Sequence, residues 1–377
     1  MRTAVRLALA GAAAVAATAL FATPALASTP PAVSGHPTPA VFVQTDGLGG
    51  NAVVAYDRAP DGSLLQAGTY PTGGLGGALT GSVVDHLASQ GSLVSDRGLL
   101  YAVNAGSNTV TVFLIRGDRL IRIETLGSGG AFPVSVATHG SLVYVLNARN
   151  GGVVQGYLRV GDFLVRVPSW NRALGLDANL TPEFTSTPGQ VAFTPDGSKL
   201  VVTTKGNGSA IDVYGVNRFG ALTAQPVKNV EPGAVPFAVA FDAGGNLVVA
   251  EAGTNSVATF SIHADGTLTQ LALAATGQAA TCWIAGAGAN FFASNAGSGS
   301  VSGYSDPGSG ALAALGNTAT DAGTVDAAAT PDGQFLYVQT GKAGIVDAFH
   351  IGAGGALTAV GSVAVPGAIG GEGIAAP

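Results

Sequence analysis

Polar residues recur at one position of a repeated strand–turn–strand pattern, and they are the residues best placed to do chemistry. The pattern is clearest in LLYAVNAGSNTVTVF (99–113), NLVVAEAGTNSVATF (246–260) and NFFASNAGSGSVSGY (290–304). The middle copy carries the carboxylate of Glu251 where its neighbours carry amides. A carboxylate can take a proton from water and an amide cannot, so Glu251 is a candidate general base.

The repeated polar position also sets the period of the chain. From the second member onward the spacing is 43 to 57 residues, and the members are Thr45, Asn104, Asn147, Thr204, Glu251, Asn295 and Thr340. A period in the forties, with no helical pattern between copies, is typical of propeller blades of four short strands. We therefore expect an all-β fold, a seven-bladed β-propeller of four-stranded blades.

The strands of one blade can be read directly from residues 189–227. Turn chemistry at Pro195-Asp196-Gly197 and at later glycines predicts strands a to d at 190–194, 199–204, 210–216 and 221–227. The opening blade, 40–70, shows only three such strands, whereas the C-terminal GGEGIAAP resembles an isolated strand a. We expect this C-terminal strand to complete the first blade and close the ring, which removes exposed sheet edges.

Propeller topology sorts the loops onto two faces. The b–c turns and the crossings between blades share one face, here called face X, and the a–b and c–d turns share the opposite face Y. His139, His263 and His350 fall on face Y. The candidate site residues fall on face X, where the central funnel is expected: His86 and Glu251 as catalytic residues, and Arg149, Lys205, Asn104, Asn147, Asn295, Asp326 and Glu372 as substrate-binding residues. The longest crossing, 168–188, is expected to form a rim or partial lid.

These residue types suit the hydrolysis of a cyclic ester. His86 is the only imidazole on face X, and an imidazole is the side chain best suited to act as a base near neutral pH, so His86 is a candidate base, with Glu251 as the alternative base or as the group that orients it. Arg149 and Lys205 could hold an oxyanion or a carboxylate, and the asparagines could bind hydroxyls. Two alternatives stay open: Glu251 closes its own turn as the asparagines do, or it joins Asn147, Asn295 and Asp326 around a Ca²⁺ ion. We expect no cofactor.

Composition and the N-terminus restrict the class of protein. The chain begins with two arginines, an apolar run and an Ala-Leu-Ala cleavage pattern, which predicts a signal peptide at 1–27, a Pro-rich leader at 28–39 and the propeller at 40–377. We expect a secreted monomer with no integral membrane segment after cleavage. The net charge of −6 and the lack of a basic face argue against nucleic acid as a partner. Cys282 is the only cysteine, which excludes an internal disulfide and suggests a buried apolar role.

Several segments together resemble the lactonase-type seven-bladed propellers, the family that includes bacterial 6-phosphogluconolactonases. They are PFAVAFDAGGNLVVAEAG, TCWIAGAGANFFASNAGSGSVSGY, VDAAATPDGQFLYVQTG and the closing GEGIAA. The resemblance implies a propeller and the hydrolysis of a sugar lactone. Phosphate recognition needs a cluster of basic residues, yet Arg149, Lys205 and Lys342 fall in separate blades. We therefore expect a small-molecule substrate that is a non-phosphorylated lactone, with a non-catalytic propeller that binds a glycan, a peptide or a cell-envelope component as the alternative.

Overall fold

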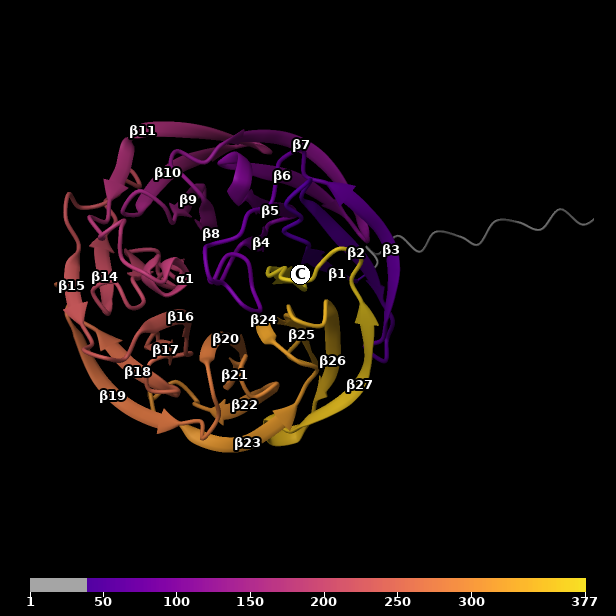
Figure 1. The fold of residues 1–377 in the computed structure, drawn as a ribbon. Helices are drawn as coiled ribbons and strands as arrows, with labels where there is room; N and C mark the ends of the chain where they lie inside the picture. The colour runs from indigo at the N-terminus through magenta and orange to yellow at the C-terminus, as the bar shows by residue number, and fades with distance from the viewer. Residues whose placement is uncertain (1–38) are drawn as a thin grey trace, which may run out of the picture. The chain divides into compact units, whose positions relative to one another are not determined.

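The computed structural model describes residues 39–377 of the 377-residue chain. The expected signal peptide and all but the last residue of the expected leader lie outside the described residues. Seven four-stranded antiparallel sheets surround a central axis as the blades of a propeller (Figure 1). The predicted fold class is confirmed.

The blades follow one another along the chain, and the strands of each blade run outward from strand a, at the axis, to strand d, at the rim. In that order, blades 1 to 3 consist of β28 (Ile374–Ala375), β1 (Ala40–Gln44), β2 (Ala52–Arg58) and β3 (Leu64–Pro71); β4 (Leu93–Asp96), β5 (Leu99–Asn104), β6 (Thr109–Arg116) and β7 (Arg119–Gly127); β8 (Pro133–His139), β9 (Leu142–Asn147), β10 (Val153–Val160) and β11 (Phe163–Ala173). Blades 4 and 5 consist of β12 (Val191–Phe193), β13 (Lys199–Thr203), β14 (Ala210–Gly215) and β15 (Val227–Val230); β16 (Pro236–Phe241), β17 (Leu247–Glu251), β18 (Ser256–Ile262) and β19 (Leu268–Ala275). Blades 6 and 7 consist of β20 (Thr281–Ala287), β21 (Asn290–Asn295), β22 (Ser300–Ser305) and β23 (Ala313–Ala319); β24 (Thr324–Ala329), β25 (Phe335–Thr340), β26 (Ile345–Ile351) and β27 (Leu357–Ala364).

The core lies between neighbouring blades. Strands b are buried along all of their length, as in β5, or along all but their first residue, as in β9, because both of their faces pack against another blade. Outer strands such as β3 alternate between exposed and half-buried residues, because only their inner side meets a neighbour. The seam between the last and first blades is a cluster that includes Val43, Val54, Tyr337 and Val346. Burial of these aliphatic and aromatic side chains is the main force that holds the ring.

The C-terminal strand closes the ring as predicted. β28 pairs antiparallel with β1, Phe42 opposite Ala375 and Val43 opposite Ile374, so it supplies strand a of blade 1. The prediction for strand d of blade 4 was wrong: β15 begins at Val227 and not at 221. Residues 221–226 make only an isolated bridge, Val216 with Leu222, and Pro226 has no N–H to donate, so the continuous ladder with strand c begins at Val227.

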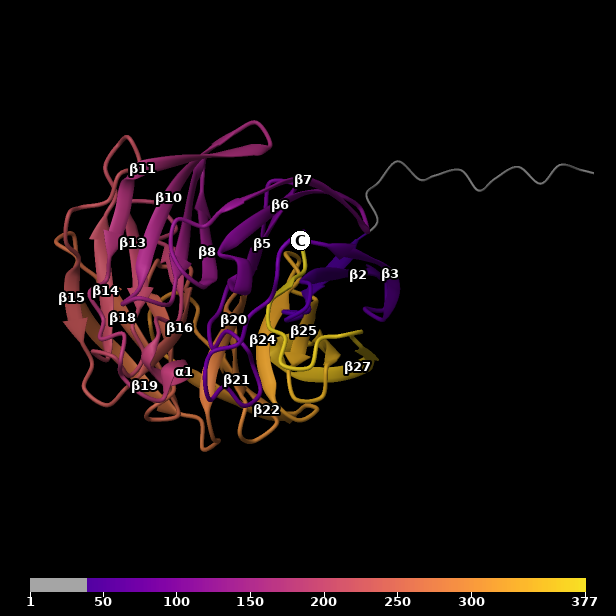
Figure 2. The ribbon, with the colours of Figure 1, turned by 45° about the horizontal axis from the view of Figure 1, so that its top comes forward.

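The crossing at 168–188 is less irregular than expected. β11 continues through its first residues to Ala173, and a short α1 (Glu183–Ser186) ends it. In Figure 2 the long β10–β11 hairpin projects beyond the outer strands of its neighbours. Two single-turn 3₁₀ helices, η1 (Ala105–Ser107) and η2 (Ala353–Gly355), complete the described elements. Within residues 39–377, no helix is long and apolar enough to cross a membrane.

Candidate functional site

The end of the axis on face X is filled by the chain itself. Residues 84–90, here called the axial plug, belong to the crossing from β3 to β4 and lie at the centre of the ring (Figure 1). The backbone of Gly341 approaches the carbonyl oxygen of Val84 so closely that a Cβ at this glycine would clash with it. Asp85, Leu87, Ala88 and Ser89 are buried. The sequence predicted an open funnel on face X, and the plug is the physical reason that this expectation was wrong.

Several blades hold the plug by hydrogen bonds. Lys205 Nζ of blade 4 donates to the carbonyl oxygen of Ala88 at 2.6 Å, and Trp283 Nε1 of blade 6 donates to that of Ser89 at 2.5 Å. The Gln90 side chain makes a two-way pair with the backbone of Ile284, at 3.0 and 2.8 Å. Since these partners are far apart in sequence, the plug can form only when the ring is assembled.

Four buried carboxyl groups surround the inner side of the plug and are here called the axial cluster: Asp46, Asp85, Asp326 and Glu372. The Glu372 carboxyl accepts hydrogen bonds from the hydroxyl and backbone N–H of Ser89 and lies beside the Asp85 carboxyl. The Glu372 backbone N–H donates to Asp46 Oδ2 at 2.8 Å. The closing C-terminal segment, the plug and the b–c turn of blade 1 therefore meet at this cluster.

Burial shifts the proton affinities of the axial cluster toward neutral pH. Desolvation raises the pKa of Asp46 and of Asp326 to about 7, and it raises the pKa of Glu372 well above its usual value, with the charges of Asp85 and Asp46 acting in the same direction. Lys205 is buried beside these acids, and desolvation lowers its pKa to about 8. Groups that titrate near neutral pH in a buried cluster are typical of functional sites.

A cavity of about 340 Å³ reaches the axial cluster from the other end of the axis. Inner-strand residues of six blades line it, from Gln90 and Ile374 near the plug to Phe193 and Phe241, the last residues of β12 and β16. These strand ends lie at face Y, so the cavity opens there and the plug closes its other end. Among the lining residues, all of them described, Asp326 is the only ionisable one.

Asp326 occupies a position that recurs in every blade. Its equivalents in blades 3 and 4 are Ser135 and Gln190, whose side chains accept a hydrogen bond from the inner strand of the next blade, at Val191 N and Val239 N. The Asp326 carboxyl accepts from the backbone N–H of Ala327 at 2.9 Å. A neutral acceptor serves this position in blades 3 and 4, so what Asp326 adds is a carboxyl group that can exchange a proton near pH 7.

The two predicted catalytic residues lie in different surroundings. His86 is half-buried in the plug, with its ring against Gly370 and its backbone N–H bonded to the Gly370 carbonyl oxygen. Glu251 ends β17 and accepts hydrogen bonds from the hydroxyls of Thr254 and Ser256, both at 3.0 Å. Burial raises the Glu251 pKa. The described contacts thus tie Glu251 to the turn of its own blade, and the pairing of His86 with Glu251 stays a prediction.

The predicted asparagines are also bonded within or beside their own blades. The Asn104 amide donates to the hydroxyls of Thr109 and Thr111, as the Asn295 amide does to those of Ser300 and Ser302. The Asn147 amide donates to backbone carbonyls, with Ser128 O at 3.1 Å as the shortest contact. This bonding accounts for an amide at these positions, and their assignment as substrate-binding residues stays a prediction.

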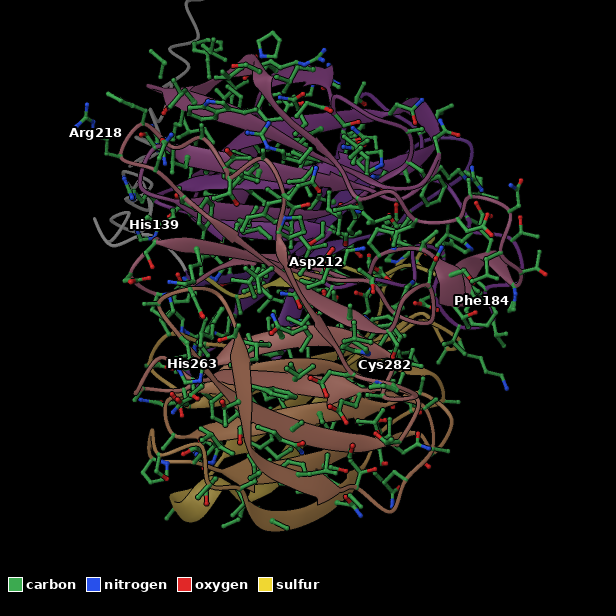
Figure 3. All side chains as sticks on the ribbon, turned by 90° about the vertical axis from the view of Figure 1, so that its left-hand side faces the viewer. His139, Phe184, Asp212, Arg218, His263 and Cys282 are labelled. Atoms are coloured by element: carbon green, nitrogen blue, oxygen red, sulfur yellow. The ribbon has the colours of Figure 1, made fainter. Side chains whose placement is uncertain are left out.

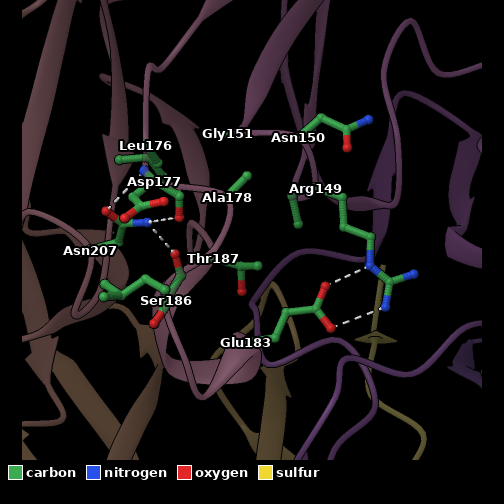
Figure 4. Close-up of a pocket in the computed structure, with 12 residues that line it drawn as sticks. Arg149, Asn150, Gly151, Leu176, Asp177, Ala178, Glu183, Ser186, Thr187 and Asn207 are labelled. Carbon is green, nitrogen blue, oxygen red and sulfur yellow. Dashed lines mark hydrogen bonds and ion pairs between the residues drawn. The ribbon is translucent and has the colours of Figure 1, made fainter.

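Arg149 lies at a smaller hollow on face X (Figure 4). Its guanidinium forms a two-pronged ion pair with Glu183 of α1, at 2.6 and 3.1 Å, and stacks 4.2 Å from the centre of the Phe132 ring. This pair lowers the Glu183 pKa to about 2. The hollow, about 150 Å³, also meets Thr187, whose hydroxyl accepts from Lys205 Nζ at 3.0 Å. Crossing 168–188 therefore packs over face X, while the charge of Arg149 is already neutralised.

The two faces are clearly separated in the structure. Figure 3 shows His139, His263 and Arg218 toward one face and Phe184 and Cys282 toward the other. Cys282 packs against the core but is only partly buried, and burial raises its thiol pKa. Within the described part of the chain, no group of three or more His, Cys, Asp or Glu residues is arranged to hold a metal ion.

Sequence reasoning missed Asp46 and Asp85. A signal for Asp46 exists: the residue after the repeated polar position is Ala or Gly in five copies, and it is Asp46 and Lys205 in the other two. Two charged residues at a position reserved for small ones mark a departure from the repeat. Asp85 has no such signal, because it lies in a crossing that has no counterpart in the other blades.

Solved structures with the same fold include two named lactonases. A candidate 6-phosphogluconolactonase of Bacteroides fragilis superposes with a TM-score of 0.69 and 20% identity, covering 90% of this chain and 98% of that one. The periplasmic gluconolactonase PpgL of Pseudomonas aeruginosa superposes with a TM-score of 0.66 and 19% identity, covering 90% and 99%. At these identities the likeness shows the fold alone. A search of curated protein sequences finds no match.

The sequence profile described as "Lactonase, 7-bladed beta-propeller" matches residues 179–370, slightly more than half of the chain. The matched region runs from the crossing before blade 4 to the segment before β28, and so includes Lys205 and Asp326. Together with the seven-bladed ring, this match shows that the chain belongs to the lactonase seven-bladed β-propeller family.

Proposed function

We propose that this protein hydrolyses a non-phosphorylated lactone in the axial cavity, with Asp326 as the general base. The family membership supports lactone hydrolysis. The observation that carries the site is that a cavity of about 340 Å³ ends at one ionisable side chain whose pKa is about 7. Cavities of roughly 300–1,000 Å³ are typical of small-molecule sites.

The proposed chemistry follows from the protonation of Asp326. Near pH 7 about half of the Asp326 carboxyls are ionised, and the ionised form takes a proton from a water molecule as the water oxygen attacks the lactone carbonyl carbon. The ring C–O bond then breaks, and the ring oxygen leaves as an alcohol after receiving that proton. Thr138 and Gln190 line the same cavity and carry the hydroxyl and amide donors that could hold the carbonyl oxygen.

Electrostatics favours an uncharged substrate. Asp326 is the only ionisable residue that lines the cavity, and the three donors of the nearby Lys205 ammonium are used by Ala88, Phe184 and Thr187. A phosphorylated lactone would therefore find no free cation to pair with and would be repelled by the ionised form of Asp326. The hydroxy-acid product would ionise, and the same charge would favour its release.

The first test is base uptake in a pH-stat by residues 28–377 against a panel of uncharged lactones, with and without Ca²⁺. Turnover that Asp326→Asn removes, and that His86→Ala and Glu251→Gln leave intact, supports the proposal. If His86→Ala or Glu251→Gln removes turnover and Asp326→Asn does not, the active site lies at the residues predicted from the sequence. No turnover on any lactone favours the alternative, an exported binding propeller.

A further inference from the structure

The side chains of the axial cavity are mostly apolar. Of the residues that line it, only Gln90, Thr138, Gln190 and Asp326 have polar side chains, and the rest are aliphatic, aromatic or glycine. Both polar atoms of the Gln90 amide are already bonded to the Ile284 backbone. The wall therefore offers few side-chain partners to a substrate.

Backbone donors along the wall are also largely occupied. The N–H of Val136 is bonded to Gly91 O at 2.8 Å, that of Val191 to Ser135 Oγ at 3.2 Å, and that of Val239 to Gln190 Oε1 at 2.6 Å. A ligand with many hydroxyl groups would find few free side-chain or N–H donors along this wall. An unpaired buried hydroxyl costs on the order of 1–3 kcal/mol, so the wall disfavours a polyhydroxylated ring.

Two phenylalanines occupy equivalent positions of neighbouring inner strands at the mouth. Phe193 and Phe241 each pair with the strand-b residue four positions before the repeated polar position, Leu200 and Leu247. The same layer in four other blades holds small residues: Ser95, Thr138, Gly286 and Ala329. Blades 4 and 5 thus place a phenylalanine each at one side of the mouth: Phe241 is partly exposed there, and Phe193, 8% exposed, packs its ring against Tyr144 and His139 and shows the cavity only an edge.

We propose that the substrate is an uncharged lactone with an apolar alkyl or aryl substituent, and that Phe193 and Phe241 bind this substituent and determine specificity. This inference rests on the proposed function, because it places the lactone ring at Asp326 and the substituent toward face Y. A protein specific for sugar lactones should prefer substrates with more hydroxyl groups. Here we expect the opposite: each added methylene raises kcat/KM, and each added hydroxyl lowers it.

The test compares three δ-lactones that share one ring: δ-valerolactone, δ-nonalactone and glucono-δ-lactone, each corrected for hydrolysis without protein. Each methylene that becomes buried is expected to raise kcat/KM by about threefold to fourfold. We expect δ-nonalactone to exceed δ-valerolactone at least tenfold and glucono-δ-lactone to be the poorest substrate. Phe193→Leu and Phe241→Ala should each lower the δ-nonalactone value about tenfold and change the δ-valerolactone value by less than threefold.

The matched control is Phe219→Ala, because Phe219 is 67% exposed in a turn of blade 4 on face Y and does not line the cavity. A preference for glucono-δ-lactone, or phenylalanine variants that behave like the control, would overturn the specificity and leave the hydrolase intact. Unchanged circular dichroism and melting temperature must accompany each variant, and Phe193→Leu keeps the core filled where alanine would leave a hole.

A binding measurement separates this inference from the proposed function. The δ-lactam with the same butyl side chain is not readily hydrolysed, and its affinity can be measured by calorimetry. Lactam binding that depends on Phe193 and Phe241, without hydrolysis of any lactone, would support the apolar cavity and overturn the hydrolase. If the lactam does not bind and lactone hydrolysis does not depend on Phe193 or Phe241, the inference about specificity is overturned, whereas the proposed hydrolase activity stands.

Discussion

Lys205 Nζ in the b–c turn of blade 4 donates a 2.6 Å hydrogen bond to the carbonyl oxygen of Ala88 in the axial plug. The ammonium also donates to Phe184 O at 2.7 Å and to Thr187 Oγ1 at 3.0 Å, and it is 1% exposed. An ammonium has three donors, so this lysine is fully used in joining the plug to crossing 168–188. Sequence reasoning assigned it to substrate, whereas its contacts are structural.

Replacement of Lys205 by methionine should strongly destabilise the ring. The change leaves three buried acceptors without a donor and removes the positive charge beside Asp85 and Glu372, so we expect a loss of about 3–5 kcal/mol in the free energy of unfolding. Urea denaturation measures this loss. Lys342→Met is the matched control because Lys342 is exposed on the same face. A Lys205→Met protein as stable as this control would show that the plug does not depend on the lysine.

The axial cluster should make the protein less stable as the pH rises from 5 to 7.5. The pKa values of Asp46 and Asp326 are about 7 in the folded chain and near 3.8 when exposed, so the folded state binds more protons than the unfolded state in this interval. Stability must then fall with rising pH, because ionisation in the buried site is unfavourable. The free energy of unfolding, measured at several pH values, should show a negative slope.

Asp326→Asn supplies the control for that slope. The asparagine keeps a carbonyl acceptor for the Ala327 N–H but cannot be ionised, so the decline between pH 5 and 7.5 should become shallower by about one proton. A wild-type stability that is flat or rises over this interval would contradict the raised pKa values of the cluster.

The contacts of Glu251 predict that its charge is dispensable. Glu251→Gln keeps an oxygen that can accept from the hydroxyls of Thr254 and Ser256, so we expect a change in stability below about 1 kcal/mol and no loss of lactone turnover. Glu251→Ala should cost about 1–3 kcal/mol, because the buried Ser256 hydroxyl loses its carboxylate acceptor. Thermal denaturation and the pH-stat assay check both parts. If Glu251→Gln removed turnover while remaining folded, Glu251 would regain the catalytic role predicted from the sequence.

Local patterns predicted most of the fold because a propeller repeats a short-range motif. Asp-Gly turns, apolar strands b and the isolated C-terminal strand fixed seven blades and the closure by Ile374 and Ala375. Strand d of blade 4 was misplaced because residues 221–226, although apolar in part, make only an isolated bridge at Leu222, and the ladder with strand c starts after Pro226. Such pairing information is not present in a single strand.

The site was harder to predict because its character depends on burial. An aspartate in a Gly-rich b–c turn is expected at the surface, yet Asp46 is completely buried against the closing segment. The assignment of loops to face X correctly placed Lys205 and Glu372 at one end of the axis. There Lys205 contacts the axial plug and Glu372 contacts Asp85. This assignment could not show that residues 84–90 fill that end, because only tertiary contacts with several other blades hold them there.

The most direct test of the central claim is the rate of lactone hydrolysis by Asp326→Asn from pH 5.5 to 8.5, beside wild type and Asp332→Asn. Asp332 is a turn aspartate of the same blade that accepts from Thr330 and Gln334, outside the cavity. We predict that wild-type kcat/KM rises through a single ionisation near pH 7, that Asp332→Asn behaves alike, and that Asp326→Asn is at least about 100-fold slower with no such rise. A folded Asp326→Asn protein that hydrolyses the lactone within threefold of wild type would contradict the assignment of Asp326 as the base.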